Sequence, residues 1–192
     1  MLILASQSPR RRELLACAGI PFVVRPASVN EERIGEEDPG EHVRRLAQAK
    51  AESVACATDE IVLGADTVVV IDGDVLGKPA DPEHAGWMLR QLSGRVHEVV
   101  TGICLRTSNR LIVDKESTRV RFVRLPEEEI AAYVASGEPM DKAGAYAIQG
   151  LASRFVDRIE GCYCNVVGLP VALVWRHLQE LAAFPAKEAG KL

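Results

Sequence analysis

Hydroxyl groups followed by arginines, close to the amino terminus, are the first residues of this chain that could bind a ligand. Ser6 and Ser8 come after a short apolar segment, and arginines occupy positions 10–12 directly after Pro9. Proline is favoured at the start of a helix, so Ser8 would be the cap and the arginines would lie in the first turn. Free helix N–H groups, hydroxyls and guanidinium groups suit an anion with several oxygens. The pattern predicts a phosphate site, with a solvated basic patch as the alternative.

Two carboxylates could supply acid–base or metal chemistry. Asp66 lies within the apolar, β-branched segment 61–71, where a charged group needs a partner or a function. It could ligate a divalent cation, act as a general base, or do both. The alternative is an aspartate at a strand end that hydrogen-bonds a turn beside Gly64. Glu31 belongs to an acidic loop, for which a solvated run of charges is the alternative.

Other polar side chains occur singly. Lys78 follows a short strand in the sequence GKP, and Lys50 lies on a predicted helix among small apolar residues. His97 has no cysteine or histidine at metal-ligand spacing, so we expect it to form structural hydrogen bonds. Cys162 and Cys164 lack the second pair of ligands that a zinc site requires, so no metal is expected there.

The segment 141–150, DKAGAYAIQG, combines small residues with groups that could recognise a planar ring. Small side chains let a backbone approach a ligand closely. Tyr146 offers a face for stacking, and the amide of Gln149 can pair with a heterocycle. A packed loop without a ligand is the alternative.

Strand and helix patterns alternate along the chain and would position these groups. Apolar, β-branched segments predict strands at 2–5, 22–25, 61–71, 75–76, 96–105 and 111–123. Helical spacing, caps and prolines predict helices at 9–18, 39–57, 82–92 and 126–135, with a final helix within 166–181. This alternation indicates an α/β or α+β fold. The hairpin across 96–123 favours a mixed sheet over an all-parallel one.

Composition argues against several classes of protein. The 192 residues suit one domain or two closely packed lobes. A net charge of −4, with no extended basic stripe, argues against nucleic-acid binding. No apolar run approaches the length of a membrane span, and we expect no signal peptide. Five scattered cysteines, an odd number, predict reduced thiols in a cytoplasmic protein.

Six ordered motifs together resemble the Maf family of nucleoside triphosphate pyrophosphatases, also called septum-formation-inhibitor-like proteins. The motifs are SQSPRRRELL, GADTVVV, LGKP, LSGRVHEVVTG, DKAGAYAIQG and GCYCNVVGLPVAL, and they cover almost the whole chain up to about Leu173. The fifth motif is similar to that of the dTTP/UTP pyrophosphatase subgroup, rather than that of the subgroup preferring 7-methyl-GTP. One departure is the pair Cys162 and Cys164, in a segment that often reads Gly-Ser-Tyr-Tyr-Asn in the family.

The resemblance implies an α/β, mixed-sheet fold of the Maf/ITPase-like kind, elongated and with a central cleft between two lobes. We expect residues 1–183 to form this single domain and residues 184–192 to form a loose tail. The implied reaction is metal-dependent hydrolysis of dTTP and UTP, or of modified pyrimidine nucleotides, to the nucleoside monophosphate and pyrophosphate. The biological role stays open between nucleotide-pool sanitation and cell-division arrest, and a homodimer stays open too.

Site residues follow from matching the motifs position by position. Asp66 matches the family's proton acceptor, and Glu31 with Asp66 would hold Mg²⁺ or Mn²⁺. The positions that match substrate-binding residues are Ser6, Ser8, Arg10, Arg11, Lys50, Thr67, Lys78 and Gln149. Three of these match positions tied to substrate choice: Arg10, Thr67 and Gln149. Phosphoryl transfer depends mainly on positioning and charge neutralisation, which the cations in this set could supply.

Two other functions remain open from the sequence. A regulatory protein of cell division could sense a nucleotide without hydrolysing it, although such a protein would not need a base like Asp66 beside a metal. A nucleic-acid binder could use the arginines at 10–12, but the negative net charge argues against it.

Overall fold

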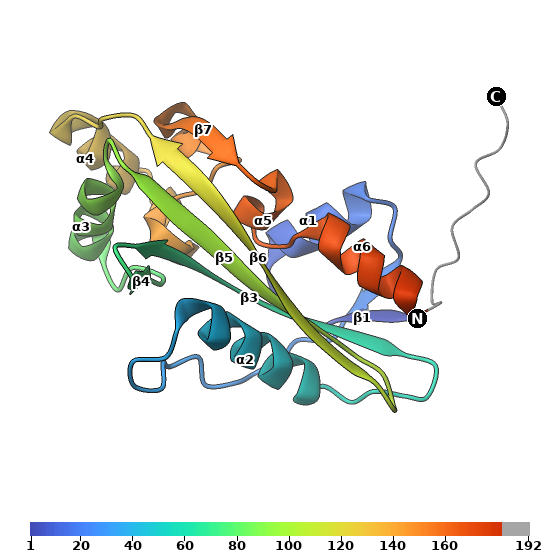
Figure 1. The fold of residues 1–192 in the computed structure, drawn as a ribbon. Helices are drawn as coiled ribbons and strands as arrows, with labels where there is room; N and C mark the ends of the chain where they lie inside the picture. The colour runs from blue at the N-terminus through green and yellow to red at the C-terminus, as the bar shows by residue number, and fades with distance from the viewer. Residues whose placement is uncertain (182–192) are drawn as a thin grey trace, which may run out of the picture.

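A seven-stranded mixed sheet crosses the molecule in the computed structural model, which describes residues 1–181 (Figure 1). Its strands are β1 (Leu2–Leu4), β2 (Phe22–Val24), β3 (Ile61–Ile71), β4 (Asp74–Leu76), β5 (Val96–Arg106), β6 (Leu111–Phe122) and β7 (Val156–Glu160). The strand order is β2-β1-β3-β5-β6-β7, and β4 pairs with β3. β1 is parallel to β2 and β3, and the other pairs are antiparallel. The prediction of a mixed sheet is confirmed.

Proline and aspartate begin several of the helices that surround the sheet. The described helices are α1 (Pro9–Cys17), α2 (Pro39–Glu52), α3 (Pro82–Leu92), α4 (Glu127–Ala135), α5 (Tyr163–Val167) and α6 (Val171–Glu180). The first three start with proline, whose missing N–H costs no helical hydrogen bond there. Asp38 caps α2 and Asp81 caps α3 by accepting from backbone N–H groups of the first turn. Short 3₁₀ segments follow α4: Glu138–Asp141, Ala143–Ala145 and Leu151–Phe155.

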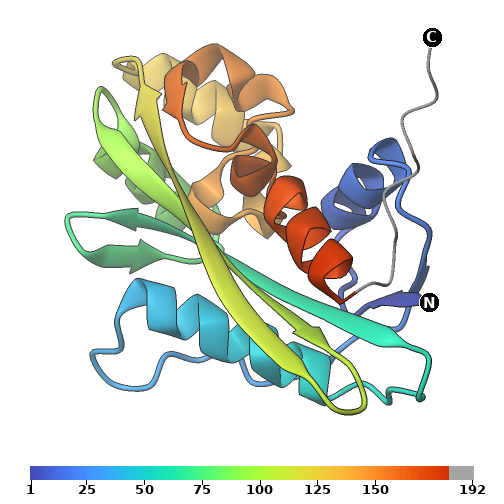
Figure 2. The same ribbon diagram turned by 45° about the vertical axis from the view of Figure 1, so that its right-hand side comes forward.

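Helices cover both faces of the sheet. Figures 1 and 2 show α2 along one face, whereas α1 and α6 lie on the other. Neighbouring strand residues therefore enter different cores. Leu63 of β3 packs in one cluster with Leu15 of α1 and Leu173 of α6, whereas Val62 packs with Ala47 of α2. This burial on both sides explains why β1 and most of β3 are apolar without alternation.

Two glycines allow α2 to lie directly against the sheet. A Cβ added to Gly64 of β3 would lie 2.1 Å from the carbonyl oxygen of Ala47, and one on Gly102 of β5 would lie 2.3 Å from that of Val43. Both distances are far shorter than a carbon–oxygen contact allows, so this packing requires glycine at both positions. The close approach places the last turn of α2, which carries Lys50, over the middle of β3.

Helix α2 is shorter than its predicted range of 39–57. It ends at Glu52, with Ser53 as the C-cap. Arg106 of β5 donates hydrogen bonds to the carbonyl oxygens of Ala51 and Val54. Helix ends leave such carbonyls without partners, so a side chain from the sheet takes the place of further helical turns.

The last third of the described chain departs most from the sequence predictions. The patterns do not predict β7 or α5, because β7 reads VDRIE with only two apolar residues and α5 spans little more than one turn. The final helix begins only at Val171, after Pro170. The tail expected at 184–192 lies outside the described residues. Within residues 1–181, no helix combines the length and the apolar character needed to cross a membrane.

Candidate active site

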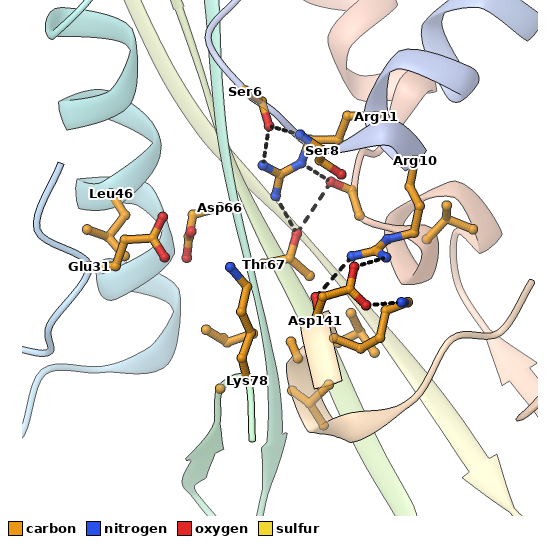
Figure 3. Close-up of a pocket in the computed structure, with 18 of the residues that line it drawn as sticks. Ser6, Ser8, Arg10, Arg11, Glu31, Leu46, Asp66, Thr67, Lys78 and Asp141 are labelled. Carbon is orange, nitrogen blue, oxygen red and sulfur yellow. Dashed lines mark hydrogen bonds and ion pairs between the residues drawn. The ribbon is translucent and has the colours of Figure 1, made fainter. Parts of the chain in front are cut away.

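A cavity of about 760 Å³ lies beside β3, between α2 and the segment that follows α4. All ten residues singled out by the sequence analysis line it: Ser6, Ser8, Arg10, Arg11, Glu31, Lys50, Asp66, Thr67, Lys78 and Gln149. Figure 3 shows many of these side chains around one space, from segments far apart in the chain. The structure therefore brings the predicted set together.

Lys50 lies between two carboxylates. Its ammonium nitrogen is 2.7 Å from Oδ1 of Asp66 and 2.6 Å from Oε1 of Glu31. The side chains of Lys50 and Asp66 are 10% and 11% exposed, whereas Glu31 is half exposed. The pKa of Glu31 is lowered: partial burial acts to raise it, but the hydrogen bond and charge of Lys50, with the charges of Lys78 and Arg11, outweigh that effect. Glu31 is therefore held in its ionised form at the edge of the cavity.

Asp66 belongs to the middle of a strand. β3 continues to Ile71, and Asp66 pairs across the sheet with Gly102 of β5. The alternative of an aspartate that caps a turn at a strand end is therefore wrong. Alternation along β3 directs Asp66 to the same face as Gly64, the face that α2 covers. The glycine that favoured a turn from sequence alone instead makes room for the helix that carries Lys50.

Arg11 is buried and almost fully hydrogen-bonded. Nε donates to the carbonyl oxygen of Gly168 at 2.8 Å, and Nη1 donates to that of Ala65 at 2.9 Å and to Oγ of Ser6 at 3.2 Å. Nη2 donates to Oγ1 of Thr67 at 3.1 Å. A guanidinium has five N–H groups, so one is left for a ligand within the described part of the chain. The pKa of Arg11 is lowered mainly by this burial.

The hydroxyl groups of the site are held by these same contacts. Oγ of Ser6 accepts from the N–H of Ser8 at 3.2 Å, while Ser8 makes no capping hydrogen bond with its own side chain. Ser8 is the N-cap of α1, as predicted, but its hydroxyl makes no capping hydrogen bond. Oγ1 of Thr67 also lies 2.9 Å from Oγ1 of Thr101 and 3.3 Å from the carbonyl oxygen of Gly168. These bonds fix the wall of the cavity before any ligand binds.

Arg10 has a charged partner that the sequence analysis missed. Its Nη1 lies 3.3 Å from Oδ2 of Asp141, and its Nη2 donates to the carbonyl oxygen of the same residue. The other carboxylate oxygen of Asp141 contacts the ammonium of Lys142. Both residues line the cavity. The adjacent opposite charges of Asp141 and Lys142 in the motif DKAG are the sequence signal for this cluster.

Tyr146 lines the cavity, but its ring is packed mainly into the core, which leaves little of the face that the sequence offered for stacking. Its side chain is buried, and its ring meets those of Phe122 and His97 edge to face, at 4.8 and 5.4 Å between centroids. Its hydroxyl lies 2.9 Å from Nε2 of His97. His97 thus has the structural hydrogen-bonding role expected for it.

Gln149 lies at the exposed tip of a loop whose two sides are anchored. The N–H of Ala147 donates to the hydroxyl of Tyr133, and the N–H of Leu151 donates to Oε2 of Glu138, both at 3.1 Å. Tyr133 in turn donates to Oε1 of Glu138 at 2.8 Å. Within residues 1–181, no hydrogen bond holds the amide of Gln149 itself. The loop is therefore positioned while the amide remains free to rotate.

The carboxylates of Glu31 and Asp66 fit a hard divalent cation only as part of a larger coordination sphere. Lys50 contacts one oxygen of each carboxylate. Within the described chain, the other oxygen of each carboxylate has no hydrogen bond or ion pair. No group of three or more His, Cys, Asp or Glu side chains is placed to hold a metal within that same part of the chain. Mg²⁺ and similar ions commonly take one or two carboxylates and complete their shell with phosphate and water. The donor set matches that pattern.

Curated proteins from several bacteria are similar to this chain over nearly its full length. A "dTTP/UTP pyrophosphatase" of Koribacter versatilis is 54% identical over 179 residues, which cover 93% of each chain. Another of that name from Symbiobacterium thermophilum is 55% identical over 171 residues, 88% of each chain. A "Nucleoside triphosphate pyrophosphatase" of Synechococcus is 50% identical over 184 residues, covering 94% of this chain and 93% of that one.

A solved structure shares the fold at low sequence identity. The Ham1 protein of Staphylococcus aureus matches with a TM-score of 0.51 and 16% identity, covering 94% of this chain and 98% of that chain. The family model described as "Maf-like protein" matches residues 1–181, the whole part of the chain that the structure describes. Together with identities above 50% to curated relatives, this match shows that the chain belongs to the Maf family.

Proposed function

We propose that this protein is a nucleoside triphosphate pyrophosphatase that hydrolyses dTTP and UTP to the nucleoside monophosphate and pyrophosphate. The names of its close relatives support this substrate class. The observation that carries the proposal is the pairing of Lys50 with Asp66 and Glu31 in a cavity that Arg10 and Lys78 also line. Such a site combines groups that neutralise a triphosphate with a carboxylate that can accept a proton.

The cations account for binding of the triphosphate. Lys78 is exposed, and Figure 3 shows its ammonium directed towards Asp66. Arg11 contributes one remaining N–H from a fixed position, and Lys50 places its charge between the carboxylates. Fixed positive charges stabilise a phosphoryl-transfer transition state without reorganising during the reaction.

A divalent cation, Mg²⁺ or Mn²⁺, would be held by Glu31 and Asp66 through the oxygens that Lys50 does not contact. When bound, it would neutralise phosphate charge and make water easier to ionise. Lys50 keeps the two carboxylates close together, since each is within 2.7 Å of the same ammonium group. Its role towards the metal is therefore to position the ligands.

Asp66 acts as the proton acceptor in this proposal. As the oxygen of water forms its new bond to phosphorus, one proton of that water passes to the Asp66 carboxylate. With water attacking the α-phosphorus, the bond from that phosphorus to the oxygen bridging the α- and β-phosphorus breaks, and its electron pair stays on that oxygen, which leaves as part of pyrophosphate. The side chain of Asp66 is 11% exposed, and partial burial strengthens its electrostatic contact with Lys50.

Product analysis on a nucleotide panel tests the proposal. Purified protein is incubated with dTTP, UTP, CTP, dATP and GTP, with Mg²⁺, with Mn²⁺ or with excess chelator. We expect pyrophosphate and the monophosphate in equal amounts, fastest from dTTP and UTP, and turnover only with metal. Release of inorganic phosphate and a diphosphate would contradict the cleavage position, and full turnover after verified metal removal would contradict the metal. Binding of dTTP without any turnover would instead assign a nucleotide sensor.

A further inference from the structure

Arg10, Asp141 and Lys142 form an ion cluster on the wall of the cavity. The two oxygens of the Asp141 carboxylate face different cations: Oδ2 lies 3.3 Å from Nη1 of Arg10, and Oδ1 contacts the ammonium of Lys142. All three residues line the same cavity as Asp66. One carboxylate thus faces two cations where a polyanionic ligand would bind.

The three side chains differ sharply in exposure. Asp141 exposes 64% of its side chain, Arg10 26% and Lys142 only 14%. Lys142 is also held from behind, because its ammonium donates to the carbonyl oxygen of Glu138 at 3.2 Å. The carboxylate is therefore the member of the cluster that can leave by a simple side-chain rotation, while the cations stay in place.

Exchange of Asp141 for a phosphate is energetically favourable on general grounds. The Asp141 carboxylate is mostly exposed, so water can replace the contacts it loses and their loss costs little. A phosphate group carries more charge than a carboxylate and offers more oxygens to a guanidinium and an ammonium. Without either anion, Arg10 and Lys142 would be adjacent uncompensated cations.

We propose that Arg10 and Lys142 form a phosphate-binding pair that Asp141 occupies as an internal anion until a substrate phosphate displaces it. The proposal rests on the proposed function and adds Lys142 to the groups that contact substrate. Figure 3 shows Arg10 with Asp141 on one side of Thr67, and Lys78 with Asp66 on the other. A triphosphate lying across Thr67 would contact both groups, so phosphates beyond the one attacked would contribute to binding.

Binding of inorganic tripolyphosphate without divalent metal tests this directly, by calorimetry. Asp141→Asn removes the competing charge and should lower the Kd about three- to tenfold. Asp157→Asn is the matched control: it removes the same charge from an ion pair with Arg121 that lies outside the cavity, and it should leave the Kd unchanged. Lys142→Met added to Asp141→Asn should cancel the gain.

The same experiment can also contradict the proposal. If Asp141 serves to orient Arg10 for substrate, Asp141→Asn will bind tripolyphosphate as weakly as wild type or more weakly, which overturns the proposal. Lys142→Met alone should weaken tripolyphosphate binding about tenfold. This variant gives a second test if Asp141→Asn does not fold. Unchanged tripolyphosphate binding in Lys142→Met would show that Lys142 is not part of the site. Tripolyphosphate carries no nucleobase, and its binding is measured without metal and without turnover. These outcomes are therefore independent of whether the protein hydrolyses dTTP.

Discussion

At the scale of single residues, the cationic side chains that line the cavity differ in the kind of partner that each one contacts. Arg11 is bonded to neutral carbonyl and hydroxyl oxygens, whereas Lys50 bridges two carboxylates. Arg10 holds an exposed carboxylate, Asp141, that a ligand can replace. Burial explains the difference, because a deeply buried guanidinium must use its N–H groups within the protein, whereas a partly exposed one can exchange partners. Positively charged residues that line the same cavity therefore have different roles.

Asp66→Asn should reduce kcat by about 10²–10⁴ while the protein stays folded. The amide keeps the size of the side chain but cannot accept a proton, and it loses the ionic contact with Lys50. Steady-state rates with dTTP, together with a thermal unfolding curve, measure the two effects separately. Asp157→Asn removes the same charge on the surface and should keep the wild-type kcat. A folded Asp66→Asn protein with normal kcat would rule out the general-base role.

Gln149 should favour UTP and dTTP over CTP by about tenfold in kcat/KM. Uracil and thymine present an N–H donor beside a carbonyl acceptor, which an amide matches in one orientation. A fixed amide would discriminate more strongly, but the hydroxyl of Tyr146 is bonded to His97 and no described group holds the Gln149 amide. The amide can therefore rotate towards the reversed pattern of cytosine, which limits selectivity.

Two variants of Gln149 separate base reading from loop structure. Gln149→Glu should lower kcat/KM for UTP and shift the UTP-to-CTP ratio towards CTP, because a carboxylate accepts from an amino group but cannot donate to a carbonyl. Gln149→Ala should bring the ratio close to one. Equal wild-type rates for UTP and CTP, or an unchanged ratio in both variants, would exclude Gln149 from base recognition.

At the scale of secondary-structure elements, the distance between α2 and the sheet determines the geometry of the site. Gly64→Ala would put a Cβ within 2.1 Å of the Ala47 carbonyl oxygen and 2.8 Å of the Ala51 nitrogen, both backbone atoms of α2. The helix would have to move away, so we expect a loss of about 1–3 kcal/mol in the free energy of unfolding. Because Lys50 moves with the helix, kcat/KM should fall as well.

Gly86→Ala is a matched control on another element. In α3 a Cβ at this position would meet only the end of the Arg90 side chain, at 3.4 Å. Alanine favours helix over glycine by about 1 kcal/mol, so this variant should be as stable as wild type or more stable, with unchanged kcat/KM. Urea denaturation and steady-state kinetics on both variants compare the two sites. Equal stability and activity for Gly64→Ala would show that α2 adapts without moving Lys50.

At the scale of the whole molecule, His97 makes stability depend on pH. Its ring is buried between Phe122 and Tyr146, Nδ1 has no hydrogen-bond partner among residues 1–181, and burial lowers the pKa to about 4 from an ordinary value of 6.5. Between these values the unfolded chain binds a proton that folded His97 does not. The stabilising effect is therefore complete above pH 6.5 and is lost as the pH falls towards 4, by up to about 3 kcal/mol.

Urea denaturation at pH 7.5 and pH 5 measures this dependence. Wild type should lose more stability on acidification than His97→Gln, which has no group that titrates in this range. His177 acts in the opposite direction: burial lowers its pKa, but hydrogen bonds and charges from Glu180 and Asp114 raise it overall. Its contribution is present below pH 6.5 and declines as the pH rises, and it is common to both proteins. The same pH dependence in wild type and His97→Gln would contradict the role of His97.

Local sequence patterns determined most of the elements and the members of the site. Segments such as 61–71 and 82–92 contain strand or helix signals within a few residues, and the structure has β3 and α3 with these bounds. The mixed sheet followed from the hairpin of 96–123 for the same reason. The motifs shared with the Maf family selected the ten side chains that line one cavity, and residue chemistry alone left Glu31 and Lys50 ambiguous. Weakly apolar segments such as β7 escaped prediction, because the neighbouring strand β6 stabilises them more than their own composition does.

Only the tertiary structure decided what each of those side chains does. Arg10 and Asp141 are 131 positions apart, and Arg11 and Gly168 are 157 apart, so no local pattern links them. Packing of α2 on Gly64 placed Lys50 between Glu31 and Asp66, and burial committed Arg11 to internal oxygens and Tyr146 to the core. Residue types determine which contacts are chemically available. Burial and the partners within reach determine which of them form, and both depend on the whole fold.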